Sequence, residues 1–378
     1  MKKLRILFTG GGTGGHIYPI VAVAAKLREW AIRNGFQPDF RYFGQPGNYA
    51  GMLAAQDIKI SHIAASKLRR YFSLLNVVDF FKFFWGIFEG LWKIYWFMPD
   101  VVFSKGGPGA LSVVVASRFY LIPLVIHESD SVLGLTNKIS AKFAAVVDLA
   151  FNSAAGNFGN TKARVAVTGN PTRQEFLVGV PENEAKKLLG FDTKRPAILF
   201  LAGSQGSNRM NDFVISNLQP LLLKFQVIHS VGKEKFAEYK AQYDFITKNF
   251  SPVLTKSYVF SDYLDDASRA MDAADLIVSR GGAGAIFEIA AKGKPSIIVP
   301  FPEASADHQK ANAYAYAETG AAIVIEQENL LPSIFMTQAE KILGDADIWR
   351  KMSGAAKDFS TPEAAGKVAN DILSLWRV

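Results

Sequence analysis

The chain has 378 residues, of which 49% are hydrophobic, so it is about twice the usual domain size and can fill two cores. It has no cysteine, which excludes a disulfide framework and thiolate catalysis, and no signal-peptide pattern precedes the first predicted strand, so we expect a cytoplasmic protein. The net charge of +8 comes from the first half: residues 1–169 hold 19 Lys or Arg against 9 Asp or Glu, whereas residues 170–378 hold 23 against 25. Such a basic half predicts an anionic partner.

The first predicted strand, residues 5–9, leads into a glycine-rich loop, and a helical pattern follows over residues 20–30. The loop, residues 10–16, reads Gly-Gly-Gly-Thr-Gly-Gly-His, which predicts a phosphate-binding arrangement. A dinucleotide fold is disfavoured, because the second strand, residues 40–43, is not followed by the acidic residue that holds an adenine ribose. His16 lies at the helix start, where the dipole favours a neutral imidazole and hence a usable base; a helix cap is the alternative role.

Residues 66–99 carry 12 aromatic side chains within 71–97 and predict one long helix with two apolar faces and a narrow polar stripe. The first face holds Leu74, Val77, Val78, Phe81, Trp85, Phe88, Trp92 and Tyr95, and the second holds Leu75, Phe80, Phe83, Phe84, Ile87, Leu91 and Ile94. The polar stripe holds Asp79, Lys82, Gly86, Glu89 and Lys93. These charges are too frequent for a membrane-spanning segment of about 20 apolar residues.

This helix follows Lys67, Arg69 and Arg70, and we expect it to pack on its own domain and to place its outer face in a membrane interface. The alternatives are a doubly buried core helix and a dimer face. Nucleic acid is not the expected partner, because the aromatic residues lie together instead of alternating with basic ones.

Several further predicted strands end in glycine turns or polar residues. Strand 101–103 precedes the glycine loop 105–109 and a helix, and strand 124–126 precedes His127, Glu128, Ser129 and Asp130. The other predicted elements are a helix from Gly134, strands 165–167, 197–201, 227–230 and 258–260, and helices that begin near residues 211 and 263. Strand 197–201 and the loop after it repeat the opening of the chain, so the sequence predicts two doubly wound α/β units that face one another.

The segment 276–313 predicts a sugar-nucleotide site. Strand 276–279 leads into a turn with three glycines, and the free N–H groups at the start of the following helix suit a diphosphate. Glu288 lies about one turn into that helix, and its carboxylate can accept hydrogen bonds from both hydroxyls of a ribose. The loop after strand 296–300 offers Glu303, Asp307, His308, Gln309 and Asn312. The alternative is an ordinary strand–helix–strand unit.

The tail from residue 332 is predicted to be helical and to pack back across both domains through Leu373, Leu375 and Trp376. Asp345 and Asp347 are interpreted as helix-capping residues rather than metal ligands. No histidine pair has ligand spacing, so we expect no metal and no other cofactor.

Seven motifs occur in an order and spacing that resemble the MurG family of glycosyltransferases: GGGTGGHIYP (10–19), HESDSVLGLTNK (127–138), GNPTR (169–173), AGSQGSN (202–208), YLDD (263–266), SRGGAGAIFEIAAKGKP (279–295) and DHQKANA (307–313). The similarity extends from the first strand to about Gln327. The resemblance implies the GT-B fold, two Rossmann-like domains with a cleft between them. Residues 1–169 would serve the lipid acceptor and the membrane, residues 170–355 the UDP-sugar, and residues 356–378 a helix on the first domain.

Members of this family are peripheral enzymes on the cytoplasmic side of the inner membrane. The resemblance implies an inverting hexosyltransferase that moves N-acetylglucosamine from UDP-N-acetylglucosamine to the 4-hydroxyl of the muramyl sugar of undecaprenyl-linked lipid I. The product, lipid II, serves peptidoglycan synthesis and hence cell shape, cell division and the cell cycle. Anionic lipid and other cell-wall synthesis proteins are the implied partners. The alternatives are a transferase of the same fold for another glycolipid, a UDP-sugar 2-epimerase, and a non-catalytic membrane scaffold.

The resemblance also assigns roles to residues at matching positions. His16 is the first choice for the catalytic base, and Glu128 and Asp130 are the second. The residues expected to bind UDP-N-acetylglucosamine are Thr13, Gly14, Gly15, Asp130, Arg173, Ser204, Gln205, Leu264, Arg280, Ala283, Gly284, Ala285, Glu288, His308 and Gln309. The residues expected to contact the acceptor or the membrane are Gly14, Gly15, His16, Gly106, Gly107, Arg69, Arg70, Phe80 and Phe84.

The chain departs from the family pattern at two of these motifs. The family usually has Glu-Gln-Asn where this chain has Glu128, Ser129 and Asp130, so a carboxylate replaces an amide in the expected acceptor site. The turn after Arg280 usually carries Ser-Gly-Ala-Leu-Thr, whereas residues 281–285 read Gly-Gly-Ala-Gly-Ala, which removes hydroxyl contacts but keeps backbone donors.

Overall fold

The computed structural model describes residues 2–65, 75–159, 161–202, 206–262, 266–302 and 307–376, with the backbone alone at 75–77. Five predicted site residues lie outside the described residues: Arg69, Arg70, Ser204, Gln205 and Leu264. The chain forms two compact units, one made of Met1–Arg173 with Thr361–Val378 and the other of Gln174–Ser360.

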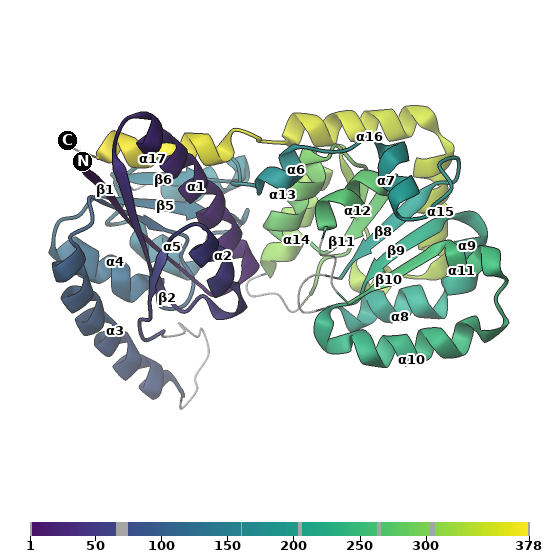
Figure 1. Cartoon of the computed structure of the whole chain (residues 1–378), viewed down its shortest axis with the longest axis horizontal. Helices are drawn as coiled ribbons and strands as arrows, with labels where there is room; N and C mark the ends of the chain where they lie inside the picture. The colour runs from purple at the N-terminus through teal and green to yellow at the C-terminus, as the bar shows by residue number, and fades with distance from the viewer. Residues whose placement is uncertain are drawn as a thin grey trace. The chain divides into compact units, whose positions relative to one another are not determined.

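The first unit is built on a parallel sheet with the strand order β3-β2-β1-β4-β5-β6-β7 (Figure 1). Its strands are β1 (Lys3–Gly10), β2 (Gln37–Gly44), β3 (Lys59–Ser61), β4 (Val101–Ser104), β5 (Leu124–Glu128), β6 (Val146–Leu149) and β7 (Arg164–Val167). Its α-helices are α1 (Gly14–Arg33), α2 (Ala50–Ala55), α3 (Leu75–Phe97), α4 (Ala110–Phe119), α5 (Leu135–Ser140) and α17 (Ala364–Leu375). Short 3₁₀ turns lie at Gly47–Tyr49 and Asn152–Phe158.

Helices cover both faces of this sheet. Because successive strand residues point to opposite faces, Ile6 and Phe8 pack in one core cluster with residues of α1 and α17, whereas Leu7 packs in another with residues of α3 and α4. Both faces of the central strands are therefore apolar, as in parallel sheets generally.

The last helix, α17, belongs to the first unit and lies beside α1 (Figure 1). Val368 and Ile372 are fully buried in the cluster that contains α1. Trp376, just after the helix, meets Trp30 and Phe36 edge to face, with ring centroids 5.6 and 4.7 Å apart.

A buried carboxyl lies where α17 meets the sheet. Asp148 of β6 is fully buried, and its carboxyl interacts with that of Asp371 on α17, which also forms an ion pair with Arg164. Burial, followed by the interaction with Asp371, raises the pKa of Asp148 to about 8, against the opposing charges of Arg164 and Lys105. Asp148 is therefore protonated in the folded protein at neutral pH.

Asp148 is expected to make the folded state less stable as the pH rises. Its pKa is raised above the unfolded value of 3.8, so its favourable contribution is complete below pH 4 and is lost as the pH rises to about 8. Asp148→Asn, which cannot ionise, should raise the free energy of unfolding at pH 8 relative to the wild type by on the order of a few kcal/mol. The difference between the two proteins should shrink by pH 5. Urea unfolding at both pH values tests this, and a difference that does not vary with pH would contradict it.

The second unit holds a parallel sheet with the strand order β10-β9-β8-β11-β12-β13. Its strands are β8 (Ala197–Leu201), β9 (Gln226–Ser230), β10 (Tyr258–Ser261), β11 (Leu276–Ser279), β12 (Ser296–Ile298) and β13 (Ala322–Val324). Its α-helices are α6 (Gln174–Leu177), α7 (Glu182–Leu188), α8 (Asn208–Ser216), α9 (Leu218–Lys224), α10 (Phe236–Ile246), α11 (Pro252–Lys256), α12 (Ala267–Ala273), α13 (Ala283–Ala291), α14 (His308–Ala317), α15 (Pro332–Gly344) and α16 (Ala346–Phe359). Short 3₁₀ turns lie at Lys233–Lys235, Thr247–Asn249 and Gln327–Asn329.

Counted within its own unit, each sheet begins with the strand order 3-2-1-4-5-6, and the first sheet adds β7. This order confirms the predicted doubly wound architecture. In such sheets ligands bind at the carboxyl ends of the strands where the order reverses, which is between β1 and β4 in the first unit and between β8 and β11 in the second.

The predicted helix cap in the tail is also confirmed, because the Asp345 side chain accepts hydrogen bonds from Asp347 N and Ile348 N at the start of α16.

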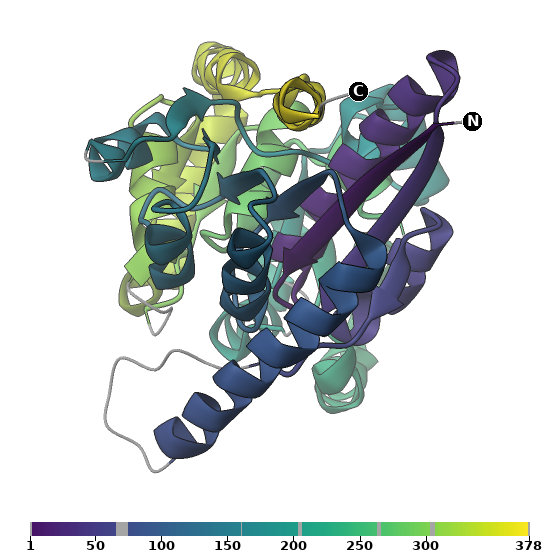
Figure 2. The ribbon, with the colours of Figure 1, turned by 90° about the vertical axis from the view of Figure 1, so that its left-hand side faces the viewer.

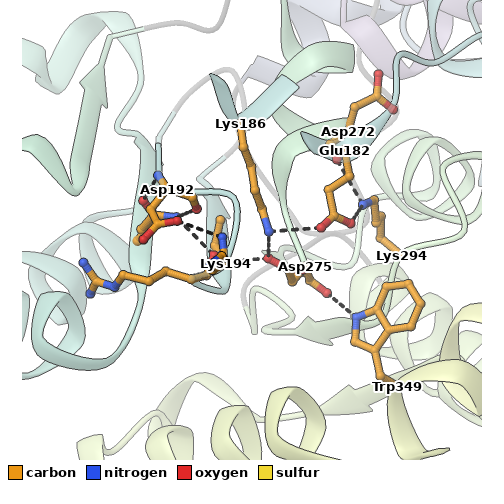
Figure 3. Close-up of polar contacts among 11 residues, drawn as sticks. Glu182, Lys186, Asp192, Lys194, Asp272, Asp275, Lys294 and Trp349 are labelled. Atoms are coloured by element: carbon orange, nitrogen blue, oxygen red, sulfur yellow. Dashed lines mark hydrogen bonds and ion pairs between the residues drawn. The ribbon is translucent and has the colours of Figure 1, made fainter. Parts of the chain in front are cut away.

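An ion-pair network lies at the opposite, amino ends of β8 and β11 (Figure 3). The Lys186 side chain is only 3% exposed, and its Nζ lies 2.7 Å from Asp275 Oδ2 and 3.0 Å from Glu182 Oε1. Lys294 contacts the other carboxylate oxygen of Glu182 at 3.0 Å. Asp275 also accepts a hydrogen bond from the first backbone N–H of β8, that of Ala197. The network ties α7 to two central strands, so we assign it a structural role.

Candidate functional site

In the first unit, the loops after β1 and β4 meet at His16. The imidazole lies on the third residue of α1, and its Nδ1 is 2.8 Å from Thr13 Oγ1. A Cβ at Gly107 would lie 2.8 Å from His16 Nε2, and one at Gly11 would lie 2.9 Å from Nδ1. The two glycine loops thus enclose the ring, and any larger residue at Gly107, where φ is +85°, would displace it.

Burial, then the nearby charge of Lys105, lowers the pKa of His16 to about 4, and Asp130 opposes both effects. The sequence predicts a neutral imidazole because of the helix dipole. The direction agrees, but burial is the largest cause in the structure. His16 is therefore unprotonated at neutral pH and able to accept a proton.

Glu128, at the end of β5, is 5% exposed and has its carboxylate occupied by three donors of its own loop. Oε1 accepts a hydrogen bond from Asp130 N at 3.1 Å, and Oε2 accepts from Gly134 N and Asn137 Nδ2, both at 3.0 Å. Burial, followed by the charge of Asp130, raises the pKa of Glu128 against these hydrogen bonds. The arrangement orders the loop from β5 to α5, and it favours His16 or Asp130 over Glu128 as a base.

Lys105, which the sequence analysis did not select, lies at the centre of this group of polar residues. It follows β4 directly, is 3% exposed, and places Nζ 2.5 Å from His127 Nδ1 and 2.6 Å from Ser129 Oγ. The sequence contained a signal that could have identified Lys105. A lysine that follows a buried strand and precedes a glycine loop lies at the carboxyl end of a parallel sheet, where ligands bind.

The other predicted residues of the first unit lie around α1 and the loop after β4. The Arg173 guanidinium lies over the Tyr18 ring, 4.1 Å from its centroid, and the Tyr18 ring in turn packs where a Cβ at Gly14 would be, at 2.8 Å. Gly106 has φ of +74°, and a Cβ there would lie 2.5 Å from Asn137 Oδ1. Thr13 and Gly15 are exposed. The first unit therefore brings together the predicted residues of the loops after β1, β4 and β5, whereas Phe80 and Phe84 lie apart from them on α3.

Helix α3 packs on the first unit through Ile94 and Leu91 of the second apolar face and also through Gly86, so the assignment of Gly86 to the polar stripe was wrong. A Cβ at Gly86 would be 3.0 Å from Ser112 Oγ on α4, and one at Gly90 would be 3.0 Å from Ala116 Cβ. Glu89, also of the stripe, accepts a hydrogen bond from the backbone N of Ala64. The reason is steric: glycine lets two helices approach closely, so a stripe that looks polar in sequence becomes the contact surface.

Helix α3 lies on the outside of the first unit (Figure 2), and most of its aromatic side chains are exposed. The exposed ones, which we call the aromatic face, are Phe80, Phe81, Phe84, Trp85, Phe88, Trp92, Tyr95 and Trp96, and each is more than half exposed. Of the predicted second apolar face, Ile94 is buried and Leu91 is half-buried. In the described part of the chain, α3 included, every helix is too short or too polar to cross a membrane.

In the second unit, β11 leads through Arg280, Gly281 and Gly282 into α13, as predicted. A Cβ at Gly281 would lie 2.1 Å from the backbone O of Gln309, so only glycine fits this contact. A Cβ at Gly282 or Gly284 would meet no protein atom within 4 Å, so packing inside the protein does not require glycine there. These two glycines instead leave room for a ligand to approach the first N–H groups of the helix. Glu288 is half-buried farther along α13.

Arg280 is half-buried, and its guanidinium contacts protein groups of neighbouring loops. Its Nη1 donates a 3.2 Å hydrogen bond to Gly206 O in the loop after β8, and its guanidinium lies 4.3 Å from the centroid of the Phe301 ring. Burial lowers the pKa of this guanidinium, which nevertheless remains charged. Arg280 thus connects three loops at the carboxyl ends of β8, β11 and β12.

The first turn of α14 packs directly on the glycine turn. Asn312 is fully buried and donates a 3.1 Å hydrogen bond to Gly281 O, and Gln309 Oε1 accepts one from Phe301 N. His308 and Gln309 are half-buried at the helix start. The structure therefore brings together Arg280, residues 283–285, His308 and Gln309. Among the described residues there is no group of three acidic or histidine side chains that could hold a metal ion.

Family models of known proteins match the regions that hold these two sites. The model of the glycosyltransferase family 28 N-terminal domain matches residues 6–148, and that of the family 28 C-terminal domain matches residues 197–368. The chain belongs to glycosyltransferase family 28. The two family 28 domains span the two sheets and both sets of loops described above.

Two relatives and one solved structure illustrate the similarity of this family 28 chain. It is 34% identical over 344 residues to UDP-N-acetylglucosamine–N-acetylmuramyl-(pentapeptide) pyrophosphoryl-undecaprenol N-acetylglucosamine transferase of Clostridium tetani, which covers 89% of this chain and 88% of the relative. It is 35% identical to the protein of the same name from Legionella pneumophila, with 90% of each chain covered. Its structure is similar to that of Acinetobacter baumannii MurG, with a TM-score of 0.74, 26% identity, and coverage of 99% and 100%.

Proposed function

We propose that this protein transfers N-acetylglucosamine from UDP-N-acetylglucosamine to the 4-hydroxyl of the muramyl sugar of lipid I, which yields lipid II for peptidoglycan synthesis. The observation that carries this proposal is the match, along about nine-tenths of the chain, to relatives that are named for this reaction. The presence of separate glycine-loop sites in the two units supports it, because the reaction needs one site for a sugar nucleotide and another for a diphosphate-linked acceptor.

The second unit binds the donor in this proposal. The start of α13 would hold the diphosphate with backbone N–H groups, which compensates for the hydroxyl residues that the turn 281–285 lacks. Glu288 would hold the ribose, and His308 and Gln309 would face the sugar. Arg280 is engaged with Gly206 O and Phe301, so its role would be to fix the loop after β8 and to add positive charge near the leaving UDP.

Glu288→Gln is expected to weaken UDP binding by about 10–100-fold, because charge-assisted hydrogen bonds contribute about 1.5–3 kcal/mol each. The wild type should prefer UDP to 2′-deoxy-UDP, and the variant should lose this preference. Isothermal titration calorimetry with both nucleotides measures the effect, with Glu328→Gln, at an exposed glutamate of the same unit, as the matched control. If Glu288→Gln kept the full preference for the 2′-hydroxyl, the ribose would have to be bound elsewhere.

The first unit binds the acceptor, and its residues supply the base. The 4-hydroxyl attacks the anomeric carbon, the bond to the UDP oxygen breaks with inversion, and His16 accepts the hydroxyl proton. The diphosphates of the substrates bring negative charge toward the ring, which favours the imidazolium as it forms. Asp130 acts in the same direction, because its carboxylate already raises the proton affinity of His16.

The aromatic face of α3 is the membrane-binding surface in this proposal. A lipid-linked acceptor stays in its bilayer, so the enzyme must come to the interface. Aromatic side chains prefer that interface, and the basic excess of the first half would be attracted to anionic lipid on the cytoplasmic side.

Replacing Trp85 and Phe88 together with serine is expected to weaken binding to anionic liposomes by about 10²-fold, since each buried aromatic side chain contributes roughly 1.5–3 kcal/mol. Liposome sedimentation measures this. Phe245→Ser, at a phenylalanine of the second unit that is 73% exposed, is the matched control and should leave binding unchanged. Equal retention of the double variant and the wild type would move the membrane-binding surface away from α3.

An assay with labelled UDP-N-acetylglucosamine tests the reaction itself. Purified protein is given lipid I, diacylglycerol or no acceptor, and the labelled products are separated. We expect transfer to lipid I only. Transfer to diacylglycerol would indicate another glycolipid acceptor, conversion of the sugar nucleotide without acceptor would indicate a 2-epimerase, and failure to bind any UDP-sugar would indicate a scaffold. Each of these three results would overturn the proposal.

A further inference from the structure

Lys105 is a buried cation whose side chain reaches the end of β5 from the loop after β4. Its three closest polar contacts are His127 Nδ1 at 2.5 Å, Ser129 Oγ at 2.6 Å and His127 O at 3.5 Å. A buried ammonium is costly unless its donors are satisfied, so these contacts fix the side chain in one place.

The hydrogen bonds around Lys105 have a defined direction. His127 Nε2 lies 2.9 Å from Gly169 O, and a carbonyl oxygen can only accept, so Nε2 carries the proton and Nδ1 accepts from Lys105. The Ser129 hydroxyl accepts from Lys105 and donates to Asn170 Oδ1 at 2.8 Å. Lys105 thereby connects the end of β5 to the turn at residues 169–170.

Charged groups surround this ammonium from every neighbouring element. The carboxylates of Glu128 and Asp130 act on it from β5 and the following loop, and Asp148 acts from β6 once it ionises, near pH 8. The imidazole of His16 on α1 is close enough for Lys105 to disfavour its protonation. The site thus contains a cation that interacts electrostatically with Asp130, the carboxylate that stands where the family usually has an amide.

We propose that Lys105 is a positioning residue that holds residues 127–130 in place, balances the carboxylate of Asp130, and acts through its charge on the imidazole of His16. Lys105 touches no substrate in this role and acts through His127, Ser129 and the charges around His16. Its effect on catalysis rests on the proposed function, whereas its effect on His16 does not.

The charge of Lys105 is expected to depend on pH in the range where the enzyme is assayed. Burial lowers its pKa to about 8, and Glu128, Asp130 and Asp148 oppose the shift. The ammonium is therefore present below pH 8 and is lost above it. His16 remains unprotonated across that range, so only Lys105 of this pair changes charge there.

Histidine titration by NMR tests the electrostatic part without any activity. The Cε1–H signal of His16 is assigned with His16→Gln and followed against pH in the wild type, in Lys105→Met and in Lys142→Met, a variant at an exposed lysine of the same unit. We expect the His16 midpoint to rise above about 4 in Lys105→Met and to stay below 6.5, because burial is the larger cause of the lowered pKa and remains in this variant. In Lys142→Met the midpoint should stay constant. A midpoint that is the same in Lys105→Met and the wild type would overturn the proposal.

Kinetics test the positioning part. Lys105→Met should lower kcat by about 10²-fold, the usual consequence of a small misplacement of a reacting group, and leave the KM for UDP-N-acetylglucosamine unchanged. The kcat/KM of the wild type should fall above pH 8, and Lys105→Arg, which keeps its charge, should remove that fall. Adding Asp130→Asn to Lys105→Met should restore part of the lost activity, because both charges are then absent.

Each result decides a different question. The positioning role would be overturned if Lys105→Met kept full activity. It would also be overturned if Lys105→Arg were active and its kcat/KM fell above pH 8 as in the wild type. If the wild type itself transferred no N-acetylglucosamine, the proposed function would fail, while the NMR titration would still decide whether Lys105 controls His16. Thermal unfolding of each variant shows that it is folded, and a folded Lys105→Met with a shifted His16 midpoint supports the proposal.

Discussion

Replacing His16 with alanine is expected to lower kcat by about 10²–10⁴-fold, the usual contribution of a general base. The structure strengthens this expectation, because the two glycine loops hold the ring and leave it unprotonated above pH 4. Activity that depends on His16 should therefore be constant from pH 5 to 8 and fall only as the pH approaches 4, where the imidazole gains its proton. Steady-state rates with lipid I across this range measure both effects.

His62→Ala provides the control for this substitution, because His62 is an exposed histidine of the same unit. It should keep the activity of the wild type. A loss below tenfold in His16→Ala would move the base to another residue, and Asp130 would be the next to replace, since the Glu128 carboxylate is occupied by three donors. The binding of UDP should be the same in His16→Ala and the wild type, because the donor site is in the second unit.

Asp275→Ala is expected to lower the free energy of unfolding of the second unit by about 3–5 kcal/mol, as removal of one partner of a buried ion pair usually does. The substitution leaves the Lys186 ammonium with Glu182 alone, and it leaves the N–H of Ala197 without its acceptor (Figure 3). Urea unfolding followed by the fluorescence of Trp349, the only tryptophan of the second unit, measures the effect.

Asp347→Ala is the matched control, because Asp347 forms an exposed ion pair with Arg350 in the same unit. Exposed pairs contribute about 0–1 kcal/mol, so this variant should unfold almost like the wild type. In addition, the double variant Lys186→Met/Asp275→Ala should lose less free energy of unfolding than the sum of the losses in the two single variants. The reason is that the double variant leaves neither charge of this pair buried without its partner. If Asp275→Ala and Asp347→Ala lost similar amounts of free energy of unfolding, the ion-pair network would contribute little to the stability of the second unit.

The sequence was sufficient to predict the elements that carry the strongest local signals. Strands 197–201 and 276–279 have the predicted bounds, and α13 begins within the predicted glycine turn, directly after Gly282. Glycine turns between an apolar run and a helix are visible in sequence because few other residues can adopt them. The predicted sheet architecture followed from the repetition of this pattern in both halves.

The features that were missed depend on contacts between distant residues. Strand β6 was not predicted, because Asp148 interrupts a short apolar run and becomes neutral only when it is buried beside Asp371. Lys105 resembles an ordinary loop lysine until the end of β5 closes over it. The stripe of α3 was misread because glycine was counted with the polar residues, whereas its small size is what matters against α4.

The membership of α17 in the first unit has a consequence for synthesis of the chain on the ribosome. The cluster around α1 is completed by Val368 and Ile372, more than two hundred residues after the strands that they cover. Domains usually fold as they emerge, but here the first unit exposes part of its apolar surface until α17 has left the ribosome. A nonsense codon near residue 360 would therefore damage the first unit and leave the second unit with its own core.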